Sequence, residues 1–154
     1  MGVAILHATM NTTHETRASN ETNALPATIL LVDDHTAIRE TLTYLLKQEG
    51  HNVIPLADSQ DAIDFVLNRG QHFDLVVTDI CMPGLDGVRL TEMFKEVYPN
   101  IPVIVMSAFA DENMIAETER FHAFAFLSKP VAKSVFLMAV RRALFEYRNV
   151  PQAA

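Results

Sequence analysis

The sequence predicts a doubly wound α/β fold, in which a five-stranded parallel sheet is covered by five helices on its two faces. Short apolar runs alternate five times with segments of helical spacing along the 154 residues. The runs are apolar on both faces, which is typical of parallel strands buried between two layers of helices. Right-handed crossovers between such strands then give an α/β sandwich. Hydrophobic residues make up 49% of the chain, enough to fill one sizeable core.

The first two strand–helix units are defined by apolar spacing and by glycine stops. A continuous apolar run at residues 29–32 is the first strand and ends at two aspartates. The helix after it carries leucines on one face and stops at Gly50. Residues 53–54 form a short second strand. Ser59 can cap the second helix, which Gly70 ends.

The third unit contains an acid and a long loop. Its strand, at residues 75–77, is followed by Asp79. A loop from Cys81 to Gly87 then leads into a helix with apolar residues at helical spacing. The Tyr-Pro-Asn sequence at residues 98–100 breaks that helix.

The last two units complete the sheet. The fourth strand is expected at residues 101–106 and is followed by a weak helix over residues 112–120. The fifth strand is expected at residues 124–127. Pro130 then opens the last helix, which runs from about residue 131 to residue 147, since proline suits the first position of a helix.

The first 26 residues differ from the rest of the chain. They are polar, rich in Thr and Asn over much of their length, and lack the basic and apolar regions of a signal peptide. We therefore expect a disordered leader over residues 1–26 and one folded domain over residues 27–149. We also expect residues 150–154 to form a short tail, with no second, output domain after the folded unit.

Composition excludes several classes of protein. The net charge of −7 disfavours direct DNA binding, which needs clustered Lys and Arg. No apolar run reaches the ~18 residues of a membrane span. The single cysteine, Cys81, excludes an internal disulfide and favours a reducing, cytoplasmic location. His35, His51 and His72 are interpreted as structural, because their spacing gives no metal site.

Polar residues follow four of the predicted strands. Asp33 and Asp34 follow the first strand, Asp79 the third, Ser107 the fourth and Lys129 the fifth. Ligands bind outside the carboxyl ends of parallel strands, so these groups are expected to lie together at one edge of the sheet. A lone aspartate there would most simply be a helix cap, but three carboxylates repel one another unless a cation neutralises them.

These residue types point to Mg²⁺ and to phosphate chemistry. Mg²⁺ is usually held by one or two carboxylates together with phosphate oxygens and water. A carboxylate beside it can attack phosphorus and form an aspartyl phosphate. The phosphoryl oxygens then need a cation and a hydrogen-bond donor. Lys129 would supply the positive charge, and the Ser107 hydroxyl would supply the hydrogen bond.

From about Thr28 to Tyr147, the chain resembles the receiver domain of two-component response regulators. The segments that carry the resemblance are ILLVDDH, VVTDICMPGLDG, VIVMSA and FLSKP. Their order and spacing are specific, with Asp79 lying 45 positions after Asp34 and 50 positions before Lys129. The resemblance implies a flavodoxin-like topology with strand order 2-1-3-4-5.

The resemblance also implies roles for the matched residues. Asp79 would be the phosphoacceptor. Lys129 would be the family's lysine, joined to Pro130 by a bond that is usually cis in the family. The Mg²⁺ ligands would be Asp33, Asp34, Asp79 and the backbone carbonyl of Cys81. Ser107 and Phe126 would be the switch residues, and the small Ala108 would leave room for the phosphoryl group.

The implied function is that of a phospho-accepting signal receiver, which catalyses only its own phosphorylation and dephosphorylation and is not otherwise an enzyme. A sensor histidine kinase or a histidine phosphotransfer protein would be the donor. Phosphorylation would draw Ser107 toward the phosphoryl group and let Phe126 turn inward, shifting the balance between two existing conformations. The face of the fourth helix, fifth strand and fifth helix would then bind a downstream protein target, or a second copy in a homodimer.

The sequence departs from the family pattern at a few positions. His122 stands where the family usually has glycine, and a positive φ there would strain histidine and change how the fourth helix ends. Cys81 and Phe109 lie two positions after Asp79 and Ser107 and are poor at orienting an attacking water. We therefore expect slow self-dephosphorylation.

One alternative remains open, a degenerate receiver that binds protein partners without phosphorylation. Such chains typically lose an acid or the lysine, and this chain keeps every matched position. A flavodoxin-like FMN carrier is disfavoured, because the acidic segment at residues 33–35 replaces the phosphate loop it needs. A hydrolase of the haloacid-dehalogenase type needs two aspartates on one side of an extended chain, whereas adjacent Asp33 and Asp34 point opposite ways.

Overall fold

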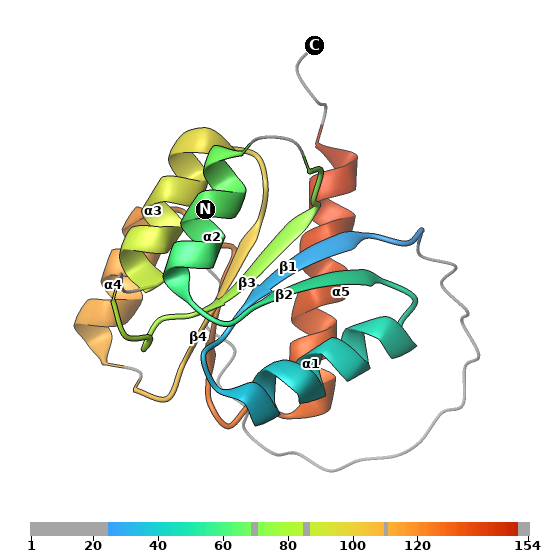
Figure 1. Ribbon diagram of the computed structural model, residues 1–154, viewed down its shortest axis with the longest axis horizontal. Helices are drawn as coiled ribbons and strands as arrows, with labels where there is room; N and C mark the ends of the chain where they lie inside the picture. The colour runs from blue at the N-terminus through green and yellow to red at the C-terminus, as the bar shows by residue number, and fades with distance from the viewer. Residues whose placement is uncertain (1–24, 69–70, 85–86, 110, 151–154) are drawn as a thin grey trace.

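The computed structural model describes residues 25–68, 71–84, 87–109 and 111–150 and confirms the predicted α/β fold (Figure 1). Five parallel strands form one sheet in the order β2-β1-β3-β4-β5. The strands are β1 (Thr28–Val32), β2 (Asn52–Leu56), β3 (Leu75–Asp79), β4 (Val103–Ser107) and β5 (Ala125–Ser128). The helices are α1 (Thr36–Gln48), α2 (Ser59–Leu67), α3 (Gly87–Val97), α4 (Glu112–Arg120) and α5 (Lys133–Asn149). Within these ranges, no helix combines the length and the apolar character that a membrane crossing requires.

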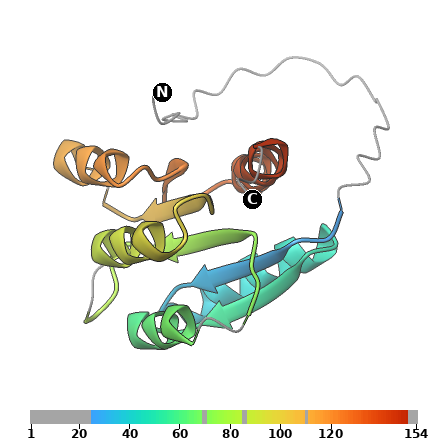
Figure 2. The same cartoon turned by 90° about the horizontal axis from the view of Figure 1, so that it is seen from above.

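Helices cover both faces of the sheet, as the apolar strands predict (Figure 2). In β1, Ile29 and Leu31 pack in the cluster that contains residues of α1 and α5. Leu30 and Val32 point the other way, into the cluster that contains residues of α2, α3 and α4. All four side chains are fully buried, so successive residues of one strand stabilise opposite layers.

The ends of the described chain meet at one end of the sheet. Arg148, in the last turn of α5, donates hydrogen bonds to the backbone carbonyls of Leu25 and Pro26 at 2.7 and 3.2 Å. These carbonyls precede β1, whereas Asp33 follows it, so this junction lies opposite the acidic residues. Most of the expected leader, the last four residues of the tail and the predicted stop at Gly70 lie outside the described residues.

The strand order places the acidic residues at a topological switch point. β1 pairs with β2 on one side and β3 on the other, so the connections from β1 and β3 run in opposite directions across the sheet. Val32 pairs with Thr78, which brings the residues that follow β1 beside the end of β3. The crevice at such a point is where ligands bind in open α/β sheets.

The structure extends the short second strand and explains its proline. The sequence predicted residues 53–54, and β2 runs from Asn52 to Leu56 and includes Pro55. Proline has no N–H to donate and is confined mainly to edge strands. β2 is an edge of the sheet, so Pro55 can pair with Leu31 of β1 without leaving a central ladder short of a donor.

Two predicted helix starts were wrong. The N-cap of α2 is Asp58, whose carboxylate accepts the Asp61 N–H at 2.8 Å, and Ser59 is the first helical residue. The two adjacent residues can both cap a helix, and the extended backbone falls at Asp58. Pro130 does not open α5, which begins at Lys133, and the Lys129–Pro130 bond is cis.

The fourth strand begins two residues later than predicted. Ile101 remains in the turn after α3, where its N–H donates to the Tyr98 carbonyl at 3.2 Å. Pro102 follows it and has no N–H. β4 therefore starts at Val103 and extends to Ser107, which becomes its last residue.

His122 adopts the positive φ that strains a histidine, with a value of 57°. Its N–H donates to the Glu119 carbonyl at 2.9 Å, and the Ala123 N–H donates to the Thr118 carbonyl at 3.0 Å. Gly50 closes α1 with the same pair of bonds and φ of 86°. Helix α4 therefore ends as a glycine-terminated helix does, and histidine bears the strain.

His122→Gly is expected to stabilise the fold by about 1 kcal/mol, because glycine adopts positive φ without the steric penalty of a side chain. Urea unfolding followed by circular dichroism would measure the change. Gly50→Ala is the matched control and should destabilise by about the same amount, although nothing lies within 4 Å of the added carbon. A loss of stability in His122→Gly would contradict the strain argument.

Candidate functional site

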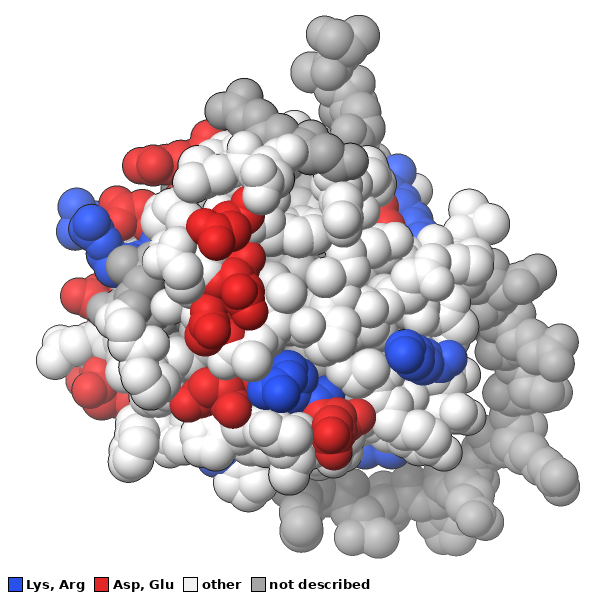
Figure 3. Space-filling model, viewed as in Figure 1, with Lys and Arg blue, Asp and Glu red and all other residues white. Residues whose placement is uncertain are grey.

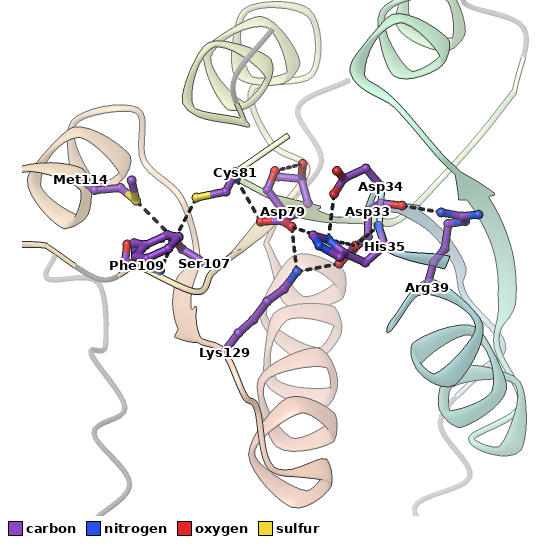
Figure 4. Close-up of polar contacts among 11 residues, drawn as sticks. Asp33, Asp34, His35, Arg39, Asp79, Cys81, Ser107, Phe109, Met114 and Lys129 are labelled. Atoms are coloured by element: carbon purple, nitrogen blue, oxygen red, sulfur yellow. Dashed lines mark hydrogen bonds and ion pairs between the residues drawn. The ribbon is translucent and has the colours of Figure 1, made fainter. Parts of the chain in front are cut away.

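The structure brings Asp33, Asp79 and Lys129 together at the carboxyl edge of the sheet (Figure 4). The Lys129 ammonium lies 2.8 Å from Asp33 Oδ2 and 2.7 Å from Asp79 Oδ2. The Asp33 and Asp79 side chains are 0% and 2% exposed, and that of Lys129 is 10% exposed. The predicted convergence of these three residues is therefore observed, and the cation lies between two buried carboxylates.

Backbone N–H groups orient the other oxygen of each buried carboxylate. Asp33 Oδ1 accepts the His35 N–H at 2.8 Å, and Asp79 Oδ1 accepts the Cys81 N–H at 3.0 Å. Arg39 also donates from Nη1 to the Asp33 carbonyl at 2.7 Å, which holds the chain where β1 ends. Each carboxylate thus has one oxygen on Lys129 and one on the main chain, so neither is free to rotate away.

The carboxylates keep Lys129 charged. Burial lowers the pKa of the Lys129 ammonium, but its hydrogen bonds to Asp33 and Asp79, together with their negative charges, outweigh burial. The pKa is therefore raised above its ordinary value of 10.5. The site carries a permanent positive charge beside the Asp79 carboxylate across the whole range of neutral pH.

Asp34 and His35 complete the cluster at its rim. Asp34 Oδ1 is buried and accepts no hydrogen bond from the described residues, although its side chain is 27% exposed. It lies 3.0 Å from His35 Nδ1. One ligand atom from each of Asp33, Asp34, His35 and Asp79 lies within 4.8 Å of the others. Interpreting His35 as only structural missed this position.

The residues present fit a magnesium ion. Asp34 Oδ1, a buried carboxylate oxygen that accepts no hydrogen bond from the described residues, lies in the same group as the carboxylates of Asp33 and Asp79. Mg²⁺ is a hard cation that prefers oxygen ligands and keeps several waters. Three carboxylates against one lysine leave an excess of negative charge that a divalent cation would balance. The cluster therefore has the donor set and the charge that Mg²⁺ requires.

The Ser107 hydroxyl is turned toward the loop that follows β4. Its Oγ lies 2.8 Å from the Phe109 carbonyl and 3.4 Å from Met114 Sδ, two acceptors that compete for one proton. It accepts the Phe109 N–H at 3.0 Å and lies 3.6 Å from Cys81 Sγ. Ser107 thus follows the predicted strand, but its hydroxyl is engaged beside the acidic cluster, not within it (Figure 4).

Phe126 and Ala108 occupy contrasting environments. Phe126 is buried and packs in the cluster on the α2–α4 face of the sheet. Its ring is therefore packed in the core. Ala108 is exposed directly after Ser107, so a small side chain borders the site.

Gly87 lets the chain pass close to Asp79. A Cβ atom at Gly87 would lie 2.3 Å from the Asp79 carbonyl oxygen and 2.6 Å from the Ile80 Cα. The Gly87 N–H donates to the Ile80 carbonyl at 3.0 Å, so α3 begins directly against the backbone that carries Asp79. Only glycine fits this approach without moving the main chain.

Gly87→Ala is expected to destabilise the fold by about 1–3 kcal/mol, because the new carbon overlaps backbone atoms that cannot rotate away. Urea unfolding would measure the loss, and amide NMR signals of Asp79 and Ile80 should shift. Gly50→Ala is the control, since it should change signals only near its own turn. Unchanged signals at Asp79 would argue against the close approach.

Comparison with known proteins identifies the family of this chain. A family model described as the response regulator receiver domain matches residues 29–141. The chain belongs to this family. The geometry agrees, since the matched range contains the acidic cluster, Lys129 and every residue of the five strands except Thr28.

Individual relatives support the same conclusion. This receiver is 36% identical over 121 residues to the response regulator protein FleR of Pseudomonas aeruginosa, a match that covers 78% of this chain and 25% of FleR. It is 34% identical over 102 residues to sporulation initiation phosphotransferase F of Bacillus subtilis, covering 66% of this chain and 81% of that protein. The receiver therefore spans about a quarter of the length of FleR but most of the length of the phosphotransferase.

Solved structures confirm the flavodoxin-like receiver fold. A CheY-like response regulator receiver domain protein from Methanospirillum hungatei superposes with a TM-score of 0.76 at 26% identity, covering 80% of this chain and 97% of that one. A receiver domain protein from Clostridium thermocellum gives a TM-score of 0.74 at 26% identity, covering 79% and 97%. Receivers of this family are phosphoacceptor signalling modules of two-component systems, which bind Mg²⁺ in an acidic pocket.

Proposed function

We propose that this receiver accepts a phosphoryl group on Asp79 from the phosphohistidine of a sensor histidine kinase or of a histidine phosphotransfer protein. The observation that carries the proposal is the placement of Asp79. Its carboxylate lies at the carboxyl edge of the sheet, 2.7 Å from the Lys129 ammonium, in a group with Asp33 and Asp34. An aspartate with only a structural role would not need a lysine and two further carboxylates beside it.

The transfer needs a nucleophile and a way to hold negative charge. An oxygen of the Asp79 carboxylate forms the new bond to phosphorus as the bond from phosphorus to the donor nitrogen breaks, and the electron pair stays on the imidazole. Lys129 stabilises the negative charge on the phosphoryl oxygens. Asp33, Asp34, Asp79 and the Cys81 carbonyl would hold Mg²⁺, which supplies further positive charge when it is bound.

Ser107 would report phosphorylation to the rest of the domain. Its hydroxyl proton would leave the Phe109 carbonyl for a phosphoryl oxygen, and the exposed Ala108 leaves room for the phosphoryl group. Because Phe109 begins the segment that leads to α4, this exchange would loosen one anchor of that segment. Phe126 is already buried, so the switch would depend on whether the unphosphorylated protein also populates an outward state.

The partners we propose are proteins. Acidic side chains gather over α2 on the face shown in Figure 3, in keeping with the net charge of −7 and with an absence of direct DNA binding. The face of α4, β5 and α5 would bind the downstream target or a second copy. We assign the receiver to residues 27–149, as a cytoplasmic module with Cys81 as a free thiol.

Intact mass after treatment with acetyl phosphate and Mg²⁺ tests the proposed function. We expect one added phosphoryl group with Mg²⁺ and none when EDTA replaces it, and peptide mapping should locate the group at Asp79. A phosphorylated histidine phosphotransfer protein offered as donor should give the same product. If no mass is gained under any of these conditions, the degenerate receiver, which binds partners without phosphorylation, is the better description.

The phosphorylated form is expected to be long-lived. Neither Cys81 nor the exposed Phe109 offers a group that positions water for attack on phosphorus. Cys81→Asn, which adds an amide, should shorten the lifetime by about tenfold or more, whereas Cys81→Ala should leave it nearly unchanged. Mass spectrometry over time at neutral pH with Mg²⁺ measures both, and a lifetime of seconds in the wild type would contradict the expectation.

A further inference from the structure

We propose that His35 is a ligand of the metal site and makes the site select a divalent transition cation, such as Co²⁺ or Zn²⁺, over Mg²⁺. The proposal rests on the metal-binding role proposed above for the same carboxylates, but not on phosphoryl transfer. It adds a nitrogen donor to a site whose other donors are oxygens.

The distances from the imidazole match one coordination shell. His35 Nδ1 lies 3.0 Å from Asp34 Oδ1, 3.7 Å from Asp33 Oδ1 and 4.0 Å from Asp79 Oδ2. In an octahedral site with bonds of about 2.1 Å, neighbouring ligand atoms are about 3 Å apart and opposite ones about 4 Å apart. The distance to Asp34 therefore matches that of neighbouring ligands, and the distances to Asp33 and Asp79 lie between the neighbouring and opposite values or close to the opposite value.

The Asp34 carboxylate gives a second indication. Asp34 Oδ1 is buried and receives no hydrogen bond from the described residues, although His35 Nδ1 lies 3.0 Å from it. A buried acceptor without a hydrogen bond costs free energy. A cation bound by both atoms would satisfy the oxygen and use the lone pair of the nitrogen.

The rest of His35 is arranged to leave its ring available. His35 is the N-cap residue of α1, but its side chain makes no capping bond. Its backbone N–H is fixed on Asp33 Oδ1, which holds the residue in place without using the ring. The ring is 62% exposed and its Nδ1 faces the acids of the cluster, so an incoming ion can reach it.

Ligand chemistry then decides the selectivity. Carboxylate, carbonyl and water oxygens suit Mg²⁺, whereas an imidazole nitrogen suits Zn²⁺ and its neighbours in the transition series. Affinity for transition cations already exceeds that for Mg²⁺ at many mixed sites, so the informative quantity is the change on removing the nitrogen. That change should be large for Co²⁺ and small for Mg²⁺.

Isothermal titration calorimetry with Co²⁺ and with Mg²⁺, each alone, tests the proposal. His35→Gln should weaken Co²⁺ binding by about tenfold or more and change Mg²⁺ binding by less than about twofold. The visible absorption of bound Co²⁺ should also shift when the nitrogen is lost. The matched control is His72→Gln, because the His72 ring is 78% exposed and lies 3.8 Å from Asp74 but has no carboxylate cluster. It should change neither affinity.

Two results would overturn the proposal. Equal Co²⁺ affinity in the wild type and in His35→Gln would exclude the imidazole as a ligand. Tighter binding of both ions by His35→Gln would identify the ring as a competing positive charge. Phosphoryl uptake from acetyl phosphate is measured separately, so its absence would count against the proposed function and leave the Co²⁺ result standing.

Discussion

Asp79→Asn is expected to take up no phosphoryl group from acetyl phosphate and to remain folded. The carboxylate oxygen is the nucleophile, and an amide oxygen in the same position is too weak to attack phosphorus. The amide has nearly the shape of the carboxylate it replaces, so the buried space stays filled. Lys129 keeps Asp33 as a partner at 2.8 Å, so no buried cation is left unpaired.

Intact mass and urea unfolding together measure this result. Asp61→Asn is the control, because Asp61 is an exposed acid in the first turn of α2, and it should be phosphorylated as the wild type is. Full uptake by Asp79→Asn would show that another residue, most simply Asp34, is the acceptor. If Asp79→Asn fails to unfold cooperatively, the negative charge of Asp79 is more important for the fold than for phosphoryl transfer.

Lys129→Met is expected to cost about 3 kcal/mol of stability at neutral pH in EDTA, because two buried carboxylates lose their cation. The methionine fills the space of the aliphatic stem, so the loss is mainly electrostatic. Lys133→Met, an exposed residue at the start of α5, should change stability little. Mg²⁺ should restore part of the loss in Lys129→Met by supplying charge to the same acids. A loss of stability equal to that of Lys133→Met would mean that the contacts of Lys129 with Asp33 and Asp79 do not stabilise the fold.

The same variant gives a pH signature. The pKa of Lys129 is raised in the folded protein, so its contribution to stability is fully present below its ordinary value of 10.5. That contribution is lost as the pH rises through the higher folded pKa. The stability difference between wild type and Lys129→Met should therefore be constant from neutral pH to about 10.5 and shrink above it. A difference that shrinks already near neutral pH would contradict this assignment.

The alternation of apolar runs with segments of helical spacing predicted the sheet correctly, because each run and each segment is defined by several residues at once. Each strand of apolar residues and each helical face averages over several positions, so the order and the number of elements could be predicted. Single boundaries could not, because they turn on one dihedral angle. Asp58 and Ser59 can both cap a helix, and spacing alone does not choose between them. Pro130 suits a helix start, yet α5 begins at Lys133.

The site was predictable to the level of the backbone and no further. Asp33, Asp79 and Lys129 follow strands of one sheet, so topology alone brings them together. The direction of the Ser107 hydroxyl depends on its rotamer and on the loop after it, neither of which spacing encodes. The position of His35 beside these acids was not predicted, because the spacing between histidines carries no information about the acids next to them.

The hydrogen bonds from Arg148 to the Leu25 and Pro26 carbonyls also make this receiver a candidate for circular permutation. The two ends of the described chain are already neighbours, so a short glycine linker from Val150 to Leu25 would close the chain without crossing the acidic edge. New ends could be opened at the exposed residues 71–72, between α2 and β3. Such a rearranged chain would keep the phosphoacceptor, the lysine and the acidic pair in place while changing the order in which the strands are made.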